Sequence, residues 1–303
     1  ICMENNSRYL EVIWGCHYAG LVYTACSSRL TKAEITYIIN DCAAKGFITS
    51  KYKSDQAAEI INDIPQAALR LMVDGTIPGF DSYEQAVSQH STEPLTERIS
   101  GMDMLYSSGT TGRPKGVKGV LPRTELTTQN GVANLAQMLF SMTEDAVYLS
   151  PAPLYHAAPL RFNLATMFTG ATSVIMEHFD AEEYLGYVEK YNITHSQLVP
   201  TMFVRMLKLP VEVRERYNLS SLKVAIHAAA PCPVQVKKQM IEWWGPVIHE
   251  YYAGTEGNGF VYCNSEMWLA HPGTVGTSIQ GVVHICDEEG NEQPQGESGT
   301  IFF

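Results

Sequence analysis

The order of hydrophobic and polar positions alternates between a helical and a strand-like period along the chain. Apolar residues recur at helical spacing over residues 7–20, 31–45, 82–89, 125–142, 160–168, 181–190, 201–207 and 234–243. Short apolar runs typical of strands lie at 47–49, 69–73, 102–107, 146–150, 171–176, 195–199, 222–227 and 247–252. This alternation predicts right-handed parallel crossovers and a layered α/β fold whose sheets are mostly parallel.

Local sequence motifs add a helix start at Thr31 and a change of pattern after Gly257. Thr31 and Glu34 have the spacing of a capping box, which predicts that a helix begins there. After Gly257 we expect the helical pattern to stop. Two strand-like runs, 282–286 and 300–303, then flank a polar segment at 287–291, which predicts a hairpin or a β-barrel-like tail.

Composition narrows the functional classes. The 303 residues include 21 basic and 32 acidic side chains, for a net charge of -11, which argues against nucleic acid as the main partner because a phosphate backbone needs clustered cations. No apolar run approaches the length of about 18 residues that a membrane-spanning helix needs. The seven cysteines are widely spaced without a C-x-x-C motif, so we expect reduced thiols in a cytoplasmic protein rather than a disulfide framework or a zinc site.

The segment with the clearest chemical signal is a glycine-rich loop at residues 106–117. Its sequence, Tyr-Ser-Ser-Gly-Thr-Thr-Gly-Arg-Pro-Lys-Gly-Val, directly follows a predicted strand. Glycines allow backbone N–H groups to approach an anion closely, hydroxyl groups donate further hydrogen bonds, and a lysine adds a point charge. The loop therefore predicts a polyphosphate site, with a polar surface turn as the alternative.

The spacing of the loop differs from that of a P-loop. Lys115 is followed by Gly116 rather than by Ser or Thr, and Pro114 with Val117 predicts that a strand, not a helix, comes next. A P-loop ATPase or kinase is therefore a weak alternative, and we expect the phosphate to be held by a loop between strands.

The segment 106–117 resembles the phosphate-binding signature of the adenylate-forming (acyl-CoA synthetase, AMP-binding) superfamily. Three further segments match motifs of this superfamily in the expected order: Pro153-Leu154-Tyr155-His156 is similar to "PLxH", His227-Ala228-Ala229-Ala230-Pro231 to "GGAAP", and Tyr252-Ala253-Gly254-Thr255-Glu256 to "YGxTE". The similarity covers essentially the whole chain and is strongest to fatty-acyl-CoA ligases. Ala228 and Ala253 depart from it, because glycine is usual at both positions.

The resemblance implies a two-step reaction. A carboxylate attacks the α-phosphorus of ATP and releases pyrophosphate, and the thiol of coenzyme A then displaces AMP from the acyl-adenylate. The substrate would be a fatty or other apolar carboxylic acid, because 153–161 contains no acidic residue that could hold a substrate amine.

The resemblance also implies the site residues. The catalytic group would comprise Lys115, His156, Thr255 and Glu256, and Mg²⁺ would be bound by Thr110 and Glu256. The nucleotide would be bound by Ser107, Ser108, Gly109, Thr110, Thr111, Gly112, Lys115, Ala228, Ala229, Ala230, Tyr251, Tyr252, Ala253 and Thr255. Tyr252 would stack on the adenine, with the three alanines as the opposite wall.

The resemblance further implies what the chain lacks. Residues 1–303 would be a large N-terminal AMP-binding domain, truncated at both ends, without the small C-terminal domain that bears a catalytic lysine. We therefore expect the chain alone to form thioesters poorly. A degenerate homologue that binds nucleotide without ligase turnover is the alternative, and a homodimer is one assembly that the resemblance allows.

Overall fold

The computed structural model describes residues 1–107, 113–121, 123–126 and 131–303. The chain divides into two compact units. The first comprises Ile1–Asp145 and Ala152–His178, and the second comprises Ala146–Pro151 and Phe179–Phe303. The first unit is therefore built from two separate stretches of chain.

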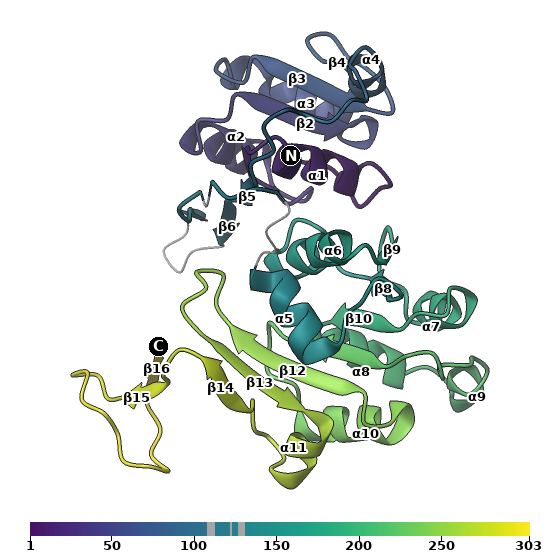
Figure 1. Ribbon diagram of the computed structural model, residues 1–303, viewed down its shortest axis with the longest axis vertical. Coiled ribbons are helices and arrows are strands. Elements are labelled where there is room, and N and C mark those ends of the chain that lie inside the picture. The colour runs from purple at the N-terminus through teal and green to yellow at the C-terminus, as the bar shows by residue number, and fades with distance from the viewer. Residues whose placement is uncertain (108–112, 122, 127–130) are drawn as a thin grey trace. The chain divides into compact units, whose positions relative to one another are not determined.

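The first unit contains a small parallel sheet with strand order β2-β3-β4 (Figure 1, purple to blue). Its strands are β2 (Gly46–Ser50), β3 (Leu69–Val73) and β4 (Asp81–Ser82), and its helices are α1 (Tyr9–Tyr18), α2 (Lys32–Asp41), α3 (Ser54–Ile60) and α4 (Tyr83–Ser88), with short 3-10 turns at Lys51–Lys53 and Ile61–Asp63. The capping box predicted for α2 is confirmed, because the Thr31 side chain accepts from the Glu34 N–H while the Glu34 side chain accepts from the Thr31 N–H. The apolar stripe of α2, Ile35, Ile38 and Ile39, is buried.

The rest of the first unit carries shorter strand pairs and two helices. Strand β1 (Val22–Tyr23) pairs in parallel with β5 (Met102–Asp103), and β6 (Leu105–Ser107) pairs with β7 (Lys115–Val117). Helix α5 (Gly131–Phe140), helix α6 (Ala157–Thr169) and strand β9 (Thr172–Ile175) complete the unit. Phe140 on α5 and Phe162 on α6 contact each other at a ring separation of 5.9 Å.

The helix predicted over 125–142 is shorter than expected. Glu125 forms an antiparallel bridge with Ile99 instead of entering the helix, and Leu126 donates a backbone hydrogen bond to Arg98. Helix α5 ends at Phe140, and the next residue, Ser141, has a positive φ of 51°. At residues 125 and 126, backbone pairing with Arg98 and Ile99 takes the place of the helix that the local pattern favours.

The second unit contains a mixed sheet with the strand order β14-β13-β12-β11-β10-β8 (Figure 1, green to yellow). Strands β8 (Val147–Ser150), β10 (His195–Leu198), β11 (Val224–His227) and β12 (Ile248–Ala253) run parallel, whereas β13 (Phe260–Asn264) and β14 (Thr277–Gln280) are antiparallel. The helices are α7 (Ala181–Lys190), α8 (Pro200–Leu207), α9 (Val211–Arg214), α10 (Val234–Trp244) and α11 (Ser265–Ala270). The α/β fold with mainly parallel central strands is confirmed.

The core of the second unit lies between these strands and helices α8 and α10, which pack against each other. All four residues of β10 and of β11 are buried, as expected for central parallel strands covered on both faces. Tyr184 on α7 stacks on Trp244 of α10 with ring centroids 6.0 Å apart. In the part of the chain that the structure describes, no helix is both long and apolar enough to cross a membrane.

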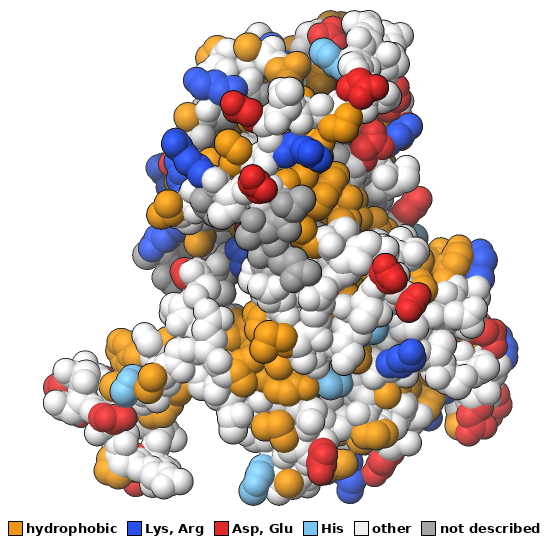
Figure 2. Space-filling view, in the orientation of Figure 1, with side chains coloured by type: hydrophobic (Ala, Val, Ile, Leu, Met, Phe, Trp, Pro, Cys, Tyr) orange, Lys and Arg blue, Asp and Glu red, His pale blue; other side chains and the backbone are white. Residues whose placement is uncertain are grey.

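The expectation that helices stop after Gly257 is wrong. Helix α11 follows β13, and its first turn is capped by the Asn264 side chain, which accepts a hydrogen bond from the Met267 N–H. Further on, β15 (His284–Cys286) pairs in antiparallel fashion with β16 (Thr300–Phe302), and Figure 2 shows hydrophobic side chains at the surface of this strand pair. The β-barrel-like form of the tail stays a prediction.

Candidate active site

The glycine-rich loop is carried by an antiparallel strand pair. Ser107 at the end of β6 is the register partner of Lys115 at the start of β7, and Tyr106 is the partner of Gly116. The prediction that a strand follows the loop is therefore confirmed. Ser107 and the exposed Lys115 flank the loop from adjacent positions on two strands. The predicted phosphate-binding residues Ser108, Gly109, Thr110, Thr111 and Gly112 lie outside the described residues.

Two contacts fix the base of this strand pair to helix α2. The Tyr106 hydroxyl donates a hydrogen bond to the Asp41 carboxylate, and burial together with this bond raises the pKa of Tyr106. The Arg113 guanidinium lies 5.7 Å from the centroid of the Tyr37 ring, within the range of a cation–π contact. A Cβ at Gly116 would lie 2.6 Å from Met104 Cε and 2.9 Å from Tyr106 Cζ, so a larger residue would require these side chains to move.

His156 occupies the N-cap position of α6, with φ of -82° and ψ of 149°. Its ring lies 4.4 Å from the ring of Tyr155. The side chain reaches the surface, yet desolvation by neighbouring atoms lowers its pKa below the usual range, and the charge of Arg29 adds to this effect. His156 is therefore neutral at pH 7 and is able to accept or donate one hydrogen bond.

The segment that precedes His156 is held by the buried amide of Asn5. Asn5 Nδ2 donates to the carbonyl oxygens of Ala152, at 3.1 Å, and Met176, at 2.9 Å. The Leu154 N–H donates to Asn5 Oδ1 at 2.9 Å. One side chain thereby satisfies three buried backbone groups and fixes the path of the chain into His156.

The predicted adenine wall lies in the turn between β11 and α10. Ala228 is buried, whereas Ala230 is exposed. Ala229 has a φ of +73°, in the left-handed region that costs a residue with a Cβ about 1–2 kcal/mol. The turn is therefore strained, and its shape has to be held by the surrounding structure.

The second nucleotide segment continues from the carboxyl end of β12. Tyr251 stacks on Phe260 of β13 at a ring separation of 5.0 Å. Tyr252 stays 43% exposed while stacking on Phe303 at 6.2 Å, so part of its ring is open to a ligand. Ala253 ends the strand, and the exposed Glu256 lies in the loop that follows.

Gly254 leaves room for the Glu256 carboxylate in this loop, because a Cβ at Gly254 would lie 2.9 Å from Glu256 Oε2. Among the residues that the structure describes, no group of three or more His, Cys, Asp and Glu side chains could hold a metal ion. A single carboxylate at Glu256 still suits Mg²⁺, which is usually bound by one or two carboxylates together with phosphate oxygens and water. Thr110, the other predicted ligand, lies outside the described residues.

The topology brings two of the predicted segments together. Strands β11 and β12 are parallel neighbours, with His227 opposite Glu250, so the chain leaves both strands at the same edge of the sheet. The turn 228–230 and the segment 251–256 therefore follow adjacent strand ends, the usual position of ligand sites in α/β sheets. Ser107, Lys115 and His156 belong to the first unit.

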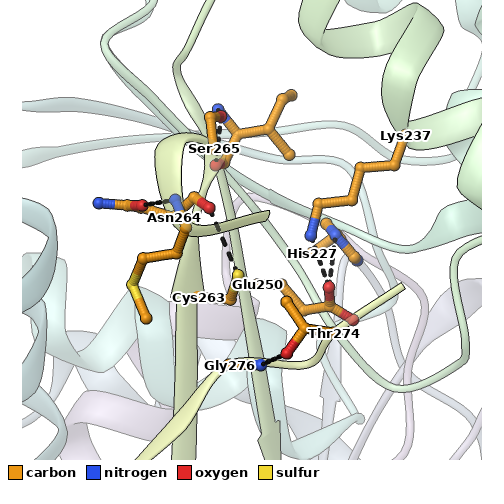
Figure 3. Close-up of polar contacts among 10 residues, drawn as sticks. His227, Lys237, Glu250, Cys263, Asn264, Ser265, Thr274 and Gly276 are labelled. Carbon is orange, nitrogen blue, oxygen red and sulfur yellow. Dashed lines mark hydrogen bonds and ion pairs between the residues drawn. The ribbon is translucent and has the colours of Figure 1, made fainter. Parts of the chain in front are cut away.

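Sequence reasoning missed a buried polar cluster beneath this edge (Figure 3). Lys237 Nζ on α10 lies 2.5 Å from Glu250 Oε2 on β12, and both side chains are buried. His227 Nε2 lies 3.5 Å from the same oxygen, and burial lowers the pKa of His227 to about 3, so the ring is neutral at pH 7. The sequence offers no periodic signal for this cluster, because its members are separated by ten and thirteen positions on three elements.

Comparison with known proteins agrees with this architecture. A family model described as AMP-binding enzyme matches residues 1–303. The chain is 30% identical over 264 residues to 4-hydroxybutyrate–CoA ligase 2 of Metallosphaera sedula, covering 82% of this chain and 46% of that protein. It is 28% identical over 327 residues to 4-coumarate–CoA ligase 2 of Petroselinum crispum, covering 99% of this chain and 56% of that protein. The solved structure of the amide bond synthetase McbA from Marinactinospora thermotolerans has a TM-score of 0.81 at 21% identity, covering 99% of this chain and 59% of that one.

The chain therefore belongs to the AMP-binding enzyme family, and its α/β fold matches the N-terminal domain of adenylate-forming enzymes. The resemblance inferred from the four sequence motifs is confirmed. The chain spans about half the length of these two curated relatives.

Proposed function

We propose that the protein containing this chain is an ATP-dependent acid–thiol ligase. A substrate carboxylate oxygen would attack the α-phosphorus of ATP, forming an acyl-adenylate with pyrophosphate as the leaving group. The coenzyme A thiolate would then attack the acyl carbonyl carbon and release AMP. The observation that carries this proposal is the placement of the turn 228–230 and the segment 251–256 at the ends of adjacent parallel strands.

In this proposal each segment has a limited physical task. The exposed part of the Tyr252 ring stacks on the adenine, with the alanine turn as the opposite wall, and Thr255 donates a hydrogen bond to the α-phosphate. Ser107 and Lys115, at the ends of the glycine-rich loop, donate to the β- and γ-phosphates together with the loop between them. Phosphate chemistry of this kind depends mainly on positioning and charge stabilisation.

Glu256 would hold Mg²⁺, which neutralises phosphate charge when it is bound. His156, neutral and at the start of α6, would lie beside the substrate carboxylate or the α-phosphate and contribute a hydrogen bond without adding charge.

The substrate is proposed to be an apolar carboxylic acid, with fatty acids as the first class to test. The segment around His156 contains no acidic side chain that would bind an amino group. The two curated relatives are named for 4-hydroxybutyrate and 4-coumarate, so short hydroxy acids and aryl acids belong in the same panel. We further propose a cytoplasmic enzyme, and we expect the 303-residue chain alone to be impaired in the thioester step.

The test is pyrophosphate exchange into ATP by the native protein, with a panel of fatty, hydroxy and aryl acids. We expect exchange that depends on one class of acid. Lys115→Ala and Glu256→Gln should each reduce exchange by about 100-fold or more, the usual cost of removing one transition-state contact.

Lys118→Ala provides the matched control, because Lys118 is an exposed cation directly after β7 and should leave exchange unchanged. ATP binding without exchange for any acid would instead identify a nucleotide-binding homologue without ligase turnover. Steady release of phosphate rather than pyrophosphate would identify an ATPase.

A further inference from the structure

The buried cluster beneath the sheet edge consists of Lys237, Glu250 and His227 (Figure 3). The buried Trp268 ring packs against its lysine. Lys237 is fully buried, and its Nζ lies 2.5 Å from Glu250 Oε2 and 5.3 Å from the centroid of the Trp268 ring. His227 is also fully buried, with Nε2 3.5 Å from the same carboxylate oxygen. Neither ring nitrogen of His227 has a hydrogen-bond partner among the described residues.

A gain in folding stability alone does not explain a buried ion pair of this kind. Removing an ammonium and a carboxylate from water costs several kcal/mol per ion, and well-packed apolar residues of similar volume are often as stable as a buried ion pair or more so. An ion pair differs from an apolar pair in fixing both distance and direction, since its short contact tolerates little displacement. The cluster is therefore better suited to setting a geometry than to strengthening the core.

The geometry that the cluster sets is that of the two proposed nucleotide segments. His227 immediately precedes the alanine turn, and Glu250 lies two positions before Tyr252 on the same face of β12. Lys237 belongs to α10, the helix that connects β11 to β12. The ion pair thus joins helix α10 to strand β12. His227, at the end of strand β11, packs against the same carboxylate.

The alanine turn also needs support from outside itself. Ala229 is held at a φ of +73°, which an isolated alanine avoids. Helix α10 follows this turn, and the Lys237–Glu250 contact attaches α10 to strand β12. The contact therefore restrains the chain that leaves the turn.

We propose that the Lys237–Glu250 ion pair, with His227 packed against it, is a positioning device for the nucleotide. It fixes the distance between the alanine turn and Tyr252, and thereby the width of the adenine slot. This inference rests on the proposed function, because it assumes that ATP binds between these two segments. The three residues act through the backbone and do not touch the reacting atoms.

The test replaces the ion pair by an apolar pair of similar volume. In the native protein carrying Lys237→Met and Glu250→Leu together, we expect a folded protein whose melting temperature stays close to that of the wild type. The dissociation constant and the KM for ATP should both rise by about ten-fold or more. The KM for the carboxylic acid and for coenzyme A should stay within about two-fold.

The matched control lies on the same helix. Lys238 and Glu242 form an exposed pair at 3.9 Å, with side chains 57% and 62% exposed, so Lys238→Met with Glu242→Leu should change neither melting temperature nor ATP affinity. A second neutral pair, Lys237→Gln with Glu250→Gln, serves if the apolar pair does not fold.

The outcomes separate this inference from the proposed function. A folded neutral variant with wild-type affinity for ATP overturns the positioning role, as does equal weakening of all three substrates. If neither double variant folds, the cluster is needed for folding of the core, and this result also overturns the positioning role. A wild-type protein that binds ATP without pyrophosphate exchange contradicts the ligase proposal, whereas the positioning role is still decided by the ATP dissociation constants. A wild-type protein that does not bind ATP overturns both.

Discussion

Two histidines of the second unit, the buried His227 and the half-buried His249, make its stability depend on pH. Burial lowers the pKa of His227 to about 3 and that of His249 to about 4, with neighbouring positive charges as secondary causes. Both values lie below that of an unfolded histidine, about 6.5. The unfolded chain therefore binds more protons than the native protein between pH 6.5 and 4, so stability falls as the pH falls through this window.

The magnitude follows from the two shifts. At pH 5 an unfolded histidine is largely protonated while both native rings stay neutral. Each histidine then lowers the free energy of unfolding by about 2 kcal/mol relative to pH 7, or about 4 kcal/mol for the two. This is a large share of a typical total of about 5–15 kcal/mol. Carboxylates whose native pKa is depressed, such as Glu34, Glu84 and Asp287, add losses of the same sign at lower pH.

Urea denaturation at pH 7, 6 and 5 measures this effect directly. His249→Gln removes one of the two largest shifts, so the loss of stability between pH 7 and 5 should become smaller by about 2 kcal/mol. His17 and His156, whose pKa values burial also lowers, add to the loss in both proteins. His284, an exposed histidine on β15, provides the control variant His284→Gln, which should keep the wild-type dependence. A free energy of unfolding that is constant between pH 7 and 5, or a slope that His249→Gln leaves unchanged, would refute the reasoning.

Two further predictions test the packing around the site. Glu250→Gln leaves the buried ammonium of Lys237 without its counter-charge and should lower the free energy of unfolding by about 3–5 kcal/mol, as measured by urea denaturation; a loss below about 1 kcal/mol would show that the pair is not desolvated. Gly116→Ala introduces a Cβ at 2.6 Å from Met104 Cε and 2.9 Å from Tyr106 Cζ, so these side chains have to move. Displacement of the Tyr106 ring disturbs its hydrogen bond to Asp41, and ATP titration should show weaker binding. Its control is Gly15→Ala in α1, where a Cβ meets no atom within 4 Å and should be neutral or stabilising by up to about 1 kcal/mol; equal ATP affinity in both variants would count against the anchoring of the loop by α2.

The sequence predicted those features whose cause is local. The capping box of Thr31 depends on residues three positions apart, and the strand after the glycine-rich loop follows from Pro114 and the apolar Val117. The adjacency of the alanine turn and Tyr252 is also accessible, because parallel crossovers place successive strand ends at one edge of a sheet. These are the features on which the candidate site depends.

The features that were missed depend on contacts between distant positions. Helix α11 has only six residues, too few for a periodic signal, and it exists because Asn264 caps it and Trp268 packs in the core. Lys237 looks like a surface lysine beside Lys238 in sequence, and only the pairing of β11 with β12 brings Glu250 within its reach. Burial of a charge is set by its partner, which the local pattern does not contain.

The buried amide of Asn5 has a consequence for the order of events during synthesis. Its acceptors and donor lie 147 to 171 positions further along the chain. At a translation rate of about 5–20 residues per second, residue 5 waits roughly 7 to 35 seconds for these partners to be synthesised. Until then its amide has only water to bind, and α1 lacks the α6 residues Leu160 and Leu164 with which it shares a core cluster. The first unit is thus the first to begin synthesis, yet its core closes only after the first strand of the second unit, β8, has been made.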